Sequence, residues 1–193
     1  MKYLNIDTKE LERKGGYYTA KEISCQPEMW LKTYEKVLEE RDQLSQFLEK
    51  ALQRTNPCVI LTGAGTSAFI GETLAGSFQR ILKVSTRSIA TTDIITHPED
   101  YFIRSKPTLL ISFARSGDSP ESLATVKMAE KNCDDLYLLT ITCNRKGELA
   151  IHSHSDNSYV FILPEETNDR SLAMTSSFSS MMLAGVLMLN LPQ

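Results

Sequence analysis

The stretch TLLISFARSGDSPES, residues 108–122, decides the fold of this chain. Its first five residues form a short apolar run after a proline, which is typical of a buried strand, and a small polar loop follows. We expect a helix to begin at Pro120, because a first helical turn does not need the N–H that proline lacks. Ser119 is predicted to cap that helix by accepting from its free N–H groups, and Glu121 complements the helix dipole.

The loop between this strand and helix is a candidate anion site. Backbone N–H groups at the helix start and the hydroxyls of Ser116 and Ser119 converge on one point. The carboxylates of Asp118 and Glu121 would repel a phosphate unless they turn away or Arg115 offsets their charge. A capped helix that follows a strand without any ligand is the alternative, and the local pattern leaves both interpretations open.

Four further strands are predicted to alternate with helices along the chain. The strands are expected at residues 58–62, 86–90, 136–141 and 159–163. Helices are expected at residues 67–83, in a short segment capped by Thr92 or Asp93, and in the apolar stretch after residue 169. Several strands are continuous apolar runs, which indicates a parallel sheet covered on both faces. The sequence therefore predicts a doubly wound α/β domain with a five-stranded parallel sheet, whose ligands bind beyond the carboxyl ends of the strands.

Residues 1–55 are predicted to form an N-terminal helical arm that includes a long charged helix. The chain before Gly16 is expected to be loosely held, Thr19–Glu22 has the spacing of a capping box, and Pro27 is predicted to restart the helix. Apolar side chains then fall on or near one helical face: Trp30, Tyr34, Val37, Leu38, Phe47, Leu48, Ala51 and Leu52. Such a stripe packs against the domain or against a second subunit, and we expect a homo-oligomer.

Composition restricts the class of protein. The chain has 193 residues, of which 41% are apolar and 23% charged, and its net charge of −3 makes neither nucleic acid nor an acidic membrane an expected partner. Its four cysteines lack the spacing of a zinc site, so we expect reduced thiols, no metal and a cytoplasmic protein. The apolar segment 172–191 is interrupted by serines and too short to span a bilayer, which predicts a buried helix.

The glycines that follow the strand at residues 58–62 fit a second motif. Residues 63–68, GAGTSA, match the dinucleotide fingerprint G-x-G-x-x-A between a strand and a helix. The fingerprint also needs an acidic residue about twenty positions later to bind ribose. This chain has Thr86, Arg87 and Ser88 there, and Asp93 comes late, so a nicotinamide or flavin dinucleotide is disfavoured.

Together, the Gly-x-Gly-Thr-Ser loop and the Ser-Gly-Asp-Ser loop resemble the sugar isomerase (SIS) domain family of phosphosugar-binding proteins, over roughly residues 45–190. The resemblance implies a flavodoxin-like fold, a phosphorylated hexose or hexosamine as the bound partner, and no cofactor. It implies phosphate-binding roles for Ser116, Gly117, Asp118, Ser119 and Ser122. It implies contacts to the sugar from Gly65, Thr66 and Ser67, and from a loop that closes over it and contains Ala173, Met174 and Thr175.

One position departs from the family pattern. Many members have a serine two positions before the residue that matches Ser116, whereas this chain has Ala114. A hydroxyl contact is therefore missing, and Arg115 is the residue expected to supply charge in its place.

A finer resemblance is to one branch of the family, the tagatose-6-phosphate ketose/aldose isomerase type, whose members are associated with galactosamine-6-phosphate deamination and isomerisation. It rests on residues 19–27, 63–67, 112–117 and 171–178. That branch carries two SIS domains, so residues 56–193 are expected to be the first of them. A non-catalytic domain that senses a phosphosugar is the alternative function.

The catalytic residues are left unassigned. Aldose–ketose chemistry needs a base that moves a proton between C1 and C2 and an acid that opens the ring, and the resemblance places these in the second domain or a neighbouring subunit. His97 is expected at the surface, and the H-x-H of His152 and His154 lacks a third metal ligand. The acids within residues 165–169 are predicted to be solvated or to cap a helix.

Overall fold

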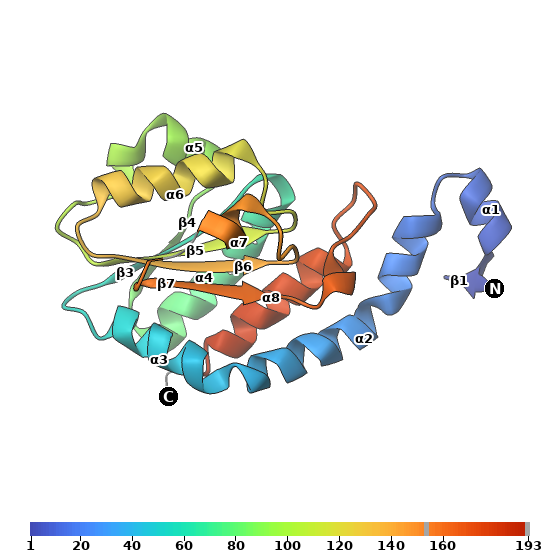
Figure 1. Cartoon of the computed structure of the whole chain (residues 1–193), viewed down its shortest axis with the longest axis horizontal. Helices are drawn as coiled ribbons and strands as arrows, with labels where there is room; N and C mark the ends of the chain where they lie inside the picture. The colour runs from blue at the N-terminus through green and yellow to red at the C-terminus, as the bar shows by residue number, and fades with distance from the viewer. Residues whose placement is uncertain (153–154, 192–193) are drawn as a thin grey trace.

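The computed structural model describes residues 1–152 and 155–191, and its centre is a five-stranded parallel sheet (Figure 1). The strands are β3 (Cys58–Gly63), β4 (Ser85–Ser88), β5 (Thr108–Ala114), β6 (Leu136–Thr142) and β7 (Ser158–Ile162). Their order in the sheet is β4-β3-β5-β6-β7, and all neighbours are parallel. This is the flavodoxin-like order, so the predicted doubly wound α/β fold is confirmed.

Helices cover both faces of the sheet. The domain contains α3 (Arg41–Leu52), η1 (Gly65–Ser67), α4 (Ala68–Leu82), α5 (Thr91–Thr96), η2 (Pro98–Asp100), α6 (Pro120–Asn132), α7 (Glu148–His152), η3 (Glu165–Thr167) and α8 (Ser176–Met188). Helices α5 and α6 lie on one face, and α3, α4 and α8 lie on the other (Figure 1). Alternate residues of β5 serve the two faces: Leu109 and Ile111 pack with α3, α4 and α8, while Leu110 packs with α5 and α6.

The region before the sheet is more regular than the sequence predicts. A short hairpin of β1 (Lys2–Tyr3) and β2 (Ile6–Asp7) leads into α1 (Thr8–Arg13), and α2 then runs from Tyr17 to Glu39. The predicted capping box is wrong, because the helix begins at Tyr17 and Thr19 lies inside its first turn. The predicted restart at Pro27 is also wrong, because Pro27 lies within a continuous helix that packs along α8.

The break between the two long helices lies at Glu40 instead. The Glu40 carboxylate accepts from Lys36 Nζ at 2.7 Å and from the Tyr159 hydroxyl at 2.8 Å, which holds the break against the edge of the sheet. The predicted apolar stripe is therefore divided between α2 and α3. Three of its four α3 members, Phe47, Leu48 and Ala51, are buried with Val37 of α2 in the core, and the fourth, Leu52, is partly buried. Trp30, Tyr34 and Leu38 of α2 are 40–48% exposed.

Three smaller boundaries differ from the sequence prediction. Strand β4 lies one to two residues earlier than predicted, and α5 begins at Thr91 after Ala90, so neither Thr92 nor Asp93 is its cap. The apolar segment predicted as one helix from residue 172 forms a helix only from Ser176, and residues 172–175 form a loop. None of the described helices combines the length and apolar character that a membrane span requires.

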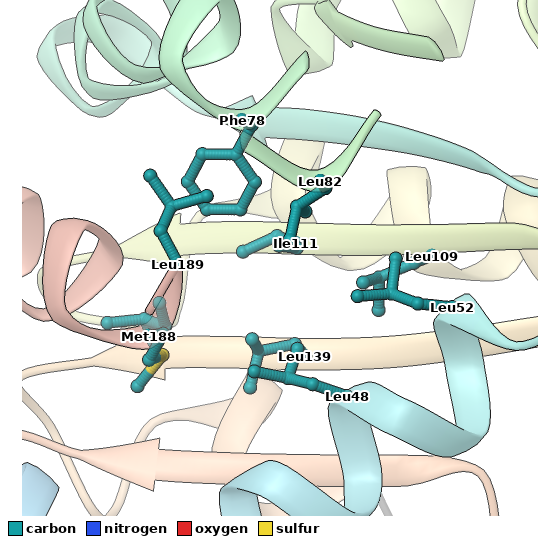
Figure 2. Close-up of a pocket in the computed structure, with 10 residues that line it drawn as sticks. Leu48, Leu52, Phe78, Leu82, Leu109, Ile111, Leu139, Met188 and Leu189 are labelled. Atoms are coloured by element: carbon teal, nitrogen blue, oxygen red, sulfur yellow. The ribbon is translucent and has the colours of Figure 1, made fainter. Parts of the chain in front are cut away.

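A small cavity lies inside the core, between the sheet and the helices α3, α4 and α8 (Figure 2). Its ten lining side chains are apolar: Leu48, Leu52, Phe78, Leu82, Leu109, Ile111, Leu139, Ile141, Met188 and Leu189. Its volume of about 10 Å³ is about the space of one water molecule, and a water there would lack hydrogen-bond partners. It is therefore a packing defect of the apolar core and not a ligand site.

Candidate functional site

The candidate site lies where the order of the sheet reverses, at the carboxyl ends of β3 and β5. The register pairs Gly63 of β3 with Phe113 of β5, so the loops that follow both strands leave the sheet at the same edge. A cleft of about 110 Å³ opens there. Its lining residues are Ala64, Ser67, Phe113, Ala114, Arg115, Ser116, Gly117, Ser119, Ser122 and Met174. Segments from three distant parts of the sequence therefore meet in one cleft.

The serine loop, residues 115–119, is held from behind by residues 144–149. Asn144 Nδ2 donates to Ser116 O at 2.8 Å, and Leu149 N donates to Gly117 O at 3.0 Å. In a trans peptide the N–H points opposite to the C=O, so the N–H groups of Gly117 and Asp118 point away from residues 144–149. Gly117 reaches this geometry with a φ of 74°, which favours glycine. The loop thus turns two backbone N–H groups away from its support, as an anion-binding loop requires.

Of the two carboxylates that argued against an anion site, that of Asp118 is bonded outside the serine loop. Asp118 Oδ1 accepts from the backbone N–H of Glu148 at 3.0 Å, at the start of α7. Its negative charge is thus used at another helix N-terminus, where it is favourable. Asp118 is not among the residues that line the cleft, and its N–H donates to Ser116 Oγ at 3.3 Å, so its backbone is part of the serine loop while its charge is directed to α7.

The two serines at the start of α6 bond to each other. Ser119 occupies the cap position of α6, but its side chain makes no capping hydrogen bond, so the predicted side-chain cap is wrong. Instead Ser119 Oγ donates to Ser122 Oγ at 2.5 Å, and Ser122 is 3% exposed. The hydroxyl pair lies beside the positive end of a helix of 13 residues, where a bound anion would be stabilised.

The glycine loop after β3 forms the opposite wall of the cleft. Gly65 has a φ of 55° and begins η1, Thr66 is exposed, and Ser67 is 3% exposed. Ser67 Oγ donates to Met174 Sδ at 3.8 Å, which brings the glycine loop into contact with residues 169–175, here called the closing loop. Of the predicted sugar-contacting residues, Ser67 and Met174 line the cleft, and Gly65, Thr66 and Ala173 lie around it without lining it.

Asp169 organises the end of the closing loop. Its buried carboxylate accepts from Thr175 N at 2.8 Å, Ser176 N at 3.2 Å and Ser177 N at 2.9 Å, and so caps α8. Thr175 Oγ1 also donates to Asp169 at 3.3 Å, so this side chain faces the cap. The expectation that an acid within residues 165–169 caps a helix is confirmed at Asp169.

Arg115 contacts the closing loop from the other side. Its Nη1 donates to the carbonyl of Ser171 at 3.0 Å and is 3.4 Å from that of Leu172. The guanidinium therefore binds backbone next to the cleft, while Ala114 is buried at the strand end. Sequence reasoning assigned Glu22 only a capping-box role and assigned Asn144 no role at the site, because their partners are more than twenty residues away in the chain; Glu22 also contacts this loop.

Among the described residues that line the cleft, none carries a carboxylate, an imidazole or a thiol. Burial raises the pKa of the Cys143 thiol to about 12, so it is protonated at neutral pH and is a poor nucleophile. His97 is exposed at the end of α5, while His154 and the side chain of His152 lie outside the described residues. Among the described residues no group of three metal-ligating side chains is found.

The fold and cleft define a doubly wound α/β domain with a serine-rich loop at its topological switch point. The family model of the SIS domain matches residues 52–191, and the chain belongs to this family. The resemblance stated from the sequence is therefore confirmed.

Relatives and solved structures agree with this assignment. The chain is 47% identical over 188 residues to D-galactosamine-6-phosphate deaminase AgaS of Shewanella sp. (strain ANA-3), covering 95% of this chain and 48% of that protein. Its structure matches the crystal structure of tagatose-6-phosphate ketose/aldose isomerase from Escherichia coli with a TM-score of 0.89 and 41% identity, covering 92% of this chain and 48% of that one. A crystal structure from Clostridium novyi NT gives a TM-score of 0.96 at 45% identity, covering 99% and 49%. The chain thus spans about half the length of the relatives it matches.

Proposed function

We propose that this chain is the phosphosugar-binding part of an aldose–ketose isomerase or deaminase that acts on galactosamine-6-phosphate or tagatose-6-phosphate. The observation that carries the proposal is the serine loop, with its N–H groups directed away from residues 144–149 and the Asp118 carboxylate bonded to α7. The names of the two relatives described above support the enzyme over a phosphosugar sensor.

The proposed phosphate position is beside the N-terminus of α6. The hydroxyls of Ser116, Ser119 and Ser122 and the backbone N–H groups of Gly117 and Asp118 would donate to it. To bind, the ligand would replace two hydrogen bonds inside the loop, the one between Ser119 and Ser122 and the one from Asp118 N to Ser116 Oγ at 3.3 Å, and the freed donors would then bond to phosphate oxygens. Because these hydrogen-bond donors are held on a supported loop, the backbone would need little reorganisation when the phosphate binds, which favours binding.

The sugar would then extend from the serine loop toward the opposite wall of the cleft. Ser67 and Met174 line that wall, Gly65, Thr66 and Ala173 neighbour them in the chain, and the Thr175 hydroxyl donates to Asp169. A sugar hydroxyl could accept or donate at Ser67 Oγ in place of its weak contact with Met174. This arrangement would hold the phosphate and the sugar at separate ends of one cleft.

The chemistry would need groups from outside this cleft. Moving a proton between C1 and C2 requires a base within hydrogen-bond reach of both carbons, and the cleft residues include no carboxylate or imidazole. We propose that residues 56–193 are the first of two SIS domains, after an N-terminal arm of residues 1–55, and that the second domain or a neighbouring subunit supplies the acid and base. The coverage of about half of each relative supports this arrangement.

We further propose a cytoplasmic homo-oligomer. The exposed Trp30, Tyr34 and Leu38 on α2 supply an apolar stripe that a second subunit could cover. All four cysteines are free, which agrees with a reducing compartment. Sedimentation of the purified chain tests the oligomeric state: a monomer at micromolar concentration would contradict the homo-oligomer.

The binding site is tested by removing both hydroxyls at the phosphate position. The double variant Ser116→Ala/Ser119→Ala should weaken galactosamine-6-phosphate binding about a hundredfold in calorimetry, because two hydrogen bonds to a charged group are lost. The matched control is Ser85→Ala/Ser105→Ala, which removes two exposed hydroxyls far from the cleft. Unchanged affinity in the first variant would rule out this site.

A turnover assay addresses the reaction itself. Galactosamine-6-phosphate is added to the full-length protein, and ammonia release and ketose formation are followed. Ammonia release supports the deaminase, and ketose formation without ammonia supports the isomerase. Binding with neither product would favour the phosphosugar sensor instead.

A further inference from the structure

The closing loop has little apolar packing at its tip. Leu172 is 95% exposed and Ala173 is also exposed, so burial of these side chains does not hold the loop in place. Yet Met174, two residues from Leu172, lines the cleft and contacts Ser67. Met174 also packs against the core, so it is the tip of the loop at residues 170–173, before this anchor, that is held mainly by polar contacts to its backbone.

Glu22 of α2 makes the most extensive of these contacts at the tip. Its carboxylate accepts from Arg170 N at 2.7 Å and from Ser171 N at 3.2 Å, and it also accepts from the Ser171 hydroxyl. An ionised carboxylate only accepts hydrogen bonds, and all three partners are donors. The helix that carries Glu22 is itself fixed to α8, since Ser176 Oγ donates to Glu22 O at 2.8 Å and Trp30 Nε1 donates to Ser179 Oγ at 2.9 Å.

The same peptide segment is held from the cleft side by Arg115. Ser171 donates its N–H to the Glu22 carboxylate, and its carbonyl accepts from the Arg115 guanidinium at 3.0 Å. The negative charge of Glu22 therefore faces the N–H of Ser171 and the positive charge of Arg115 faces its carbonyl. Each of these two hydrogen bonds is strengthened because one partner is charged. Arg115 is adjacent in sequence to Ser116 of the serine loop. A continuous series of contacts thus runs from α2 through the closing loop to the proposed phosphate position.

We propose that Glu22 is a positioning residue for the sugar end of the cleft, and that α2 is thereby part of the functional site. This inference rests on the proposed function, because it assigns Glu22 to the binding of the sugar and not of the phosphate. The serine loop is supported directly by residues 144–149, and within the described part of the chain its link to Glu22 runs only through Arg115 and Ser171, so the phosphate position should depend on this carboxylate less than the sugar end does.

The role of Glu22 in holding the loop is measured first without any ligand. Amide hydrogen exchange at Arg170 and Ser171 should be about tenfold faster in Glu22→Ala, because both N–H groups lose their acceptor. Glu22→Gln keeps one acceptor oxygen and should give an intermediate rate. The control Glu35→Gln changes an exposed carboxylate on the same helix and should leave exchange unchanged. Unchanged exchange at both amides in Glu22→Ala would overturn the proposal.

The role in ligand binding is measured with two probes. Galactosamine-6-phosphate affinity should fall about tenfold in Glu22→Ala and less in Glu22→Gln, whereas the affinity for inorganic phosphate should stay within about twofold. Equal losses for both probes, or no loss for the sugar phosphate, would overturn the positioning role. The two claims fail in different ways. If the unmodified chain binds inorganic phosphate and the sugar phosphate equally well, the proposed function itself fails. If the unmodified chain prefers the sugar phosphate and Glu22→Ala keeps that preference, only the positioning role fails.

Discussion

Gly147→Ala should displace the serine loop from behind. A Cβ at residue 147 would lie 2.2 Å from Ser116 O and 3.1 Å from Gly117 Cα, and both are backbone atoms that cannot rotate out of the way. Carbon and oxygen need about 3 Å or more, so the serine loop would move by nearly 1 Å. Such overpacking costs about 1–3 kcal/mol, and loss of the hydrogen bond from Asn144 to Ser116 O adds about 1 kcal/mol.

The total of about 2–4 kcal/mol is measurable in two ways. Urea denaturation should show the loss directly, and the melting temperature should fall by about 4–16 °C for a chain of this size. The same displacement would move the N–H groups of Gly117 and Asp118, so phosphate affinity should fall as well. Affinity is therefore measured at a temperature where the variant is folded.

The matched control is Gly76→Ala, in the exposed middle of α4. A Cβ there meets nothing within 4 Å, and alanine is the better helix former, so this variant should be about 0.5–1 kcal/mol more stable with unchanged phosphate affinity. If Gly147→Ala kept the stability and phosphate affinity of the unmodified chain, the close approach of the two loops would be refuted.

Two further predictions concern titratable groups. Burial raises the pKa of Cys143 to about 12, so a thiol reagent at pH 8 should modify the half-buried Cys25 and Cys58 while Cys143 reacts only after unfolding. Mass spectrometry of labelled peptides measures the order of modification, and labelling of Cys143 before Cys25 and Cys58 in the folded chain would contradict this prediction. Lys32, 2.7 Å from Glu166, lowers the pKa of that carboxyl, so the pair stabilises the fold above the unfolded pKa of Glu166 and loses this effect as pH falls through the folded value. Because both groups are largely exposed the effect should be small, and Glu166→Gln should be slightly less stable than the unmodified chain at pH 7 but not at pH 3 in denaturation curves. An equal difference at both pH values would contradict this cause.

Local patterns were enough to predict the strand–loop–helix unit at residues 108–122. The apolar run forms β5, every residue of which is buried, and α6 begins at Pro120 as predicted. These signals depend on neighbours within one helical turn or one strand, so they act before any tertiary contact forms. The alternation of strands and helices likewise predicted the doubly wound sheet, because parallel strands need helical crossovers.

The same kind of local pattern was misleading in the N-terminal region. Thr19 and Glu22 have the spacing of a capping box, but the helix starts before them because α2 is packed along α8. That packing places Glu22 beside Ser171, 149 positions later in the chain, and no pattern near Glu22 indicates this partner. The local pattern was also only half right at Ser119. It correctly predicted that Ser119 occupies the cap position of α6, but the hydroxyl donates to Ser122 Oγ and not to the helix cap.

The sequence by itself determined that a serine-rich loop lies between a buried strand and a helix N-terminus, and motifs from several segments identified the SIS family. Only the tertiary structure decided where Asp118 turns its charge, that residues 144–149 support the serine loop, and that α2 holds the closing loop. The physical reason is that strand ends and helix starts follow from residues a few positions apart, whereas these contacts join segments about 30 to 150 residues apart that the parallel sheet and helix packing bring together.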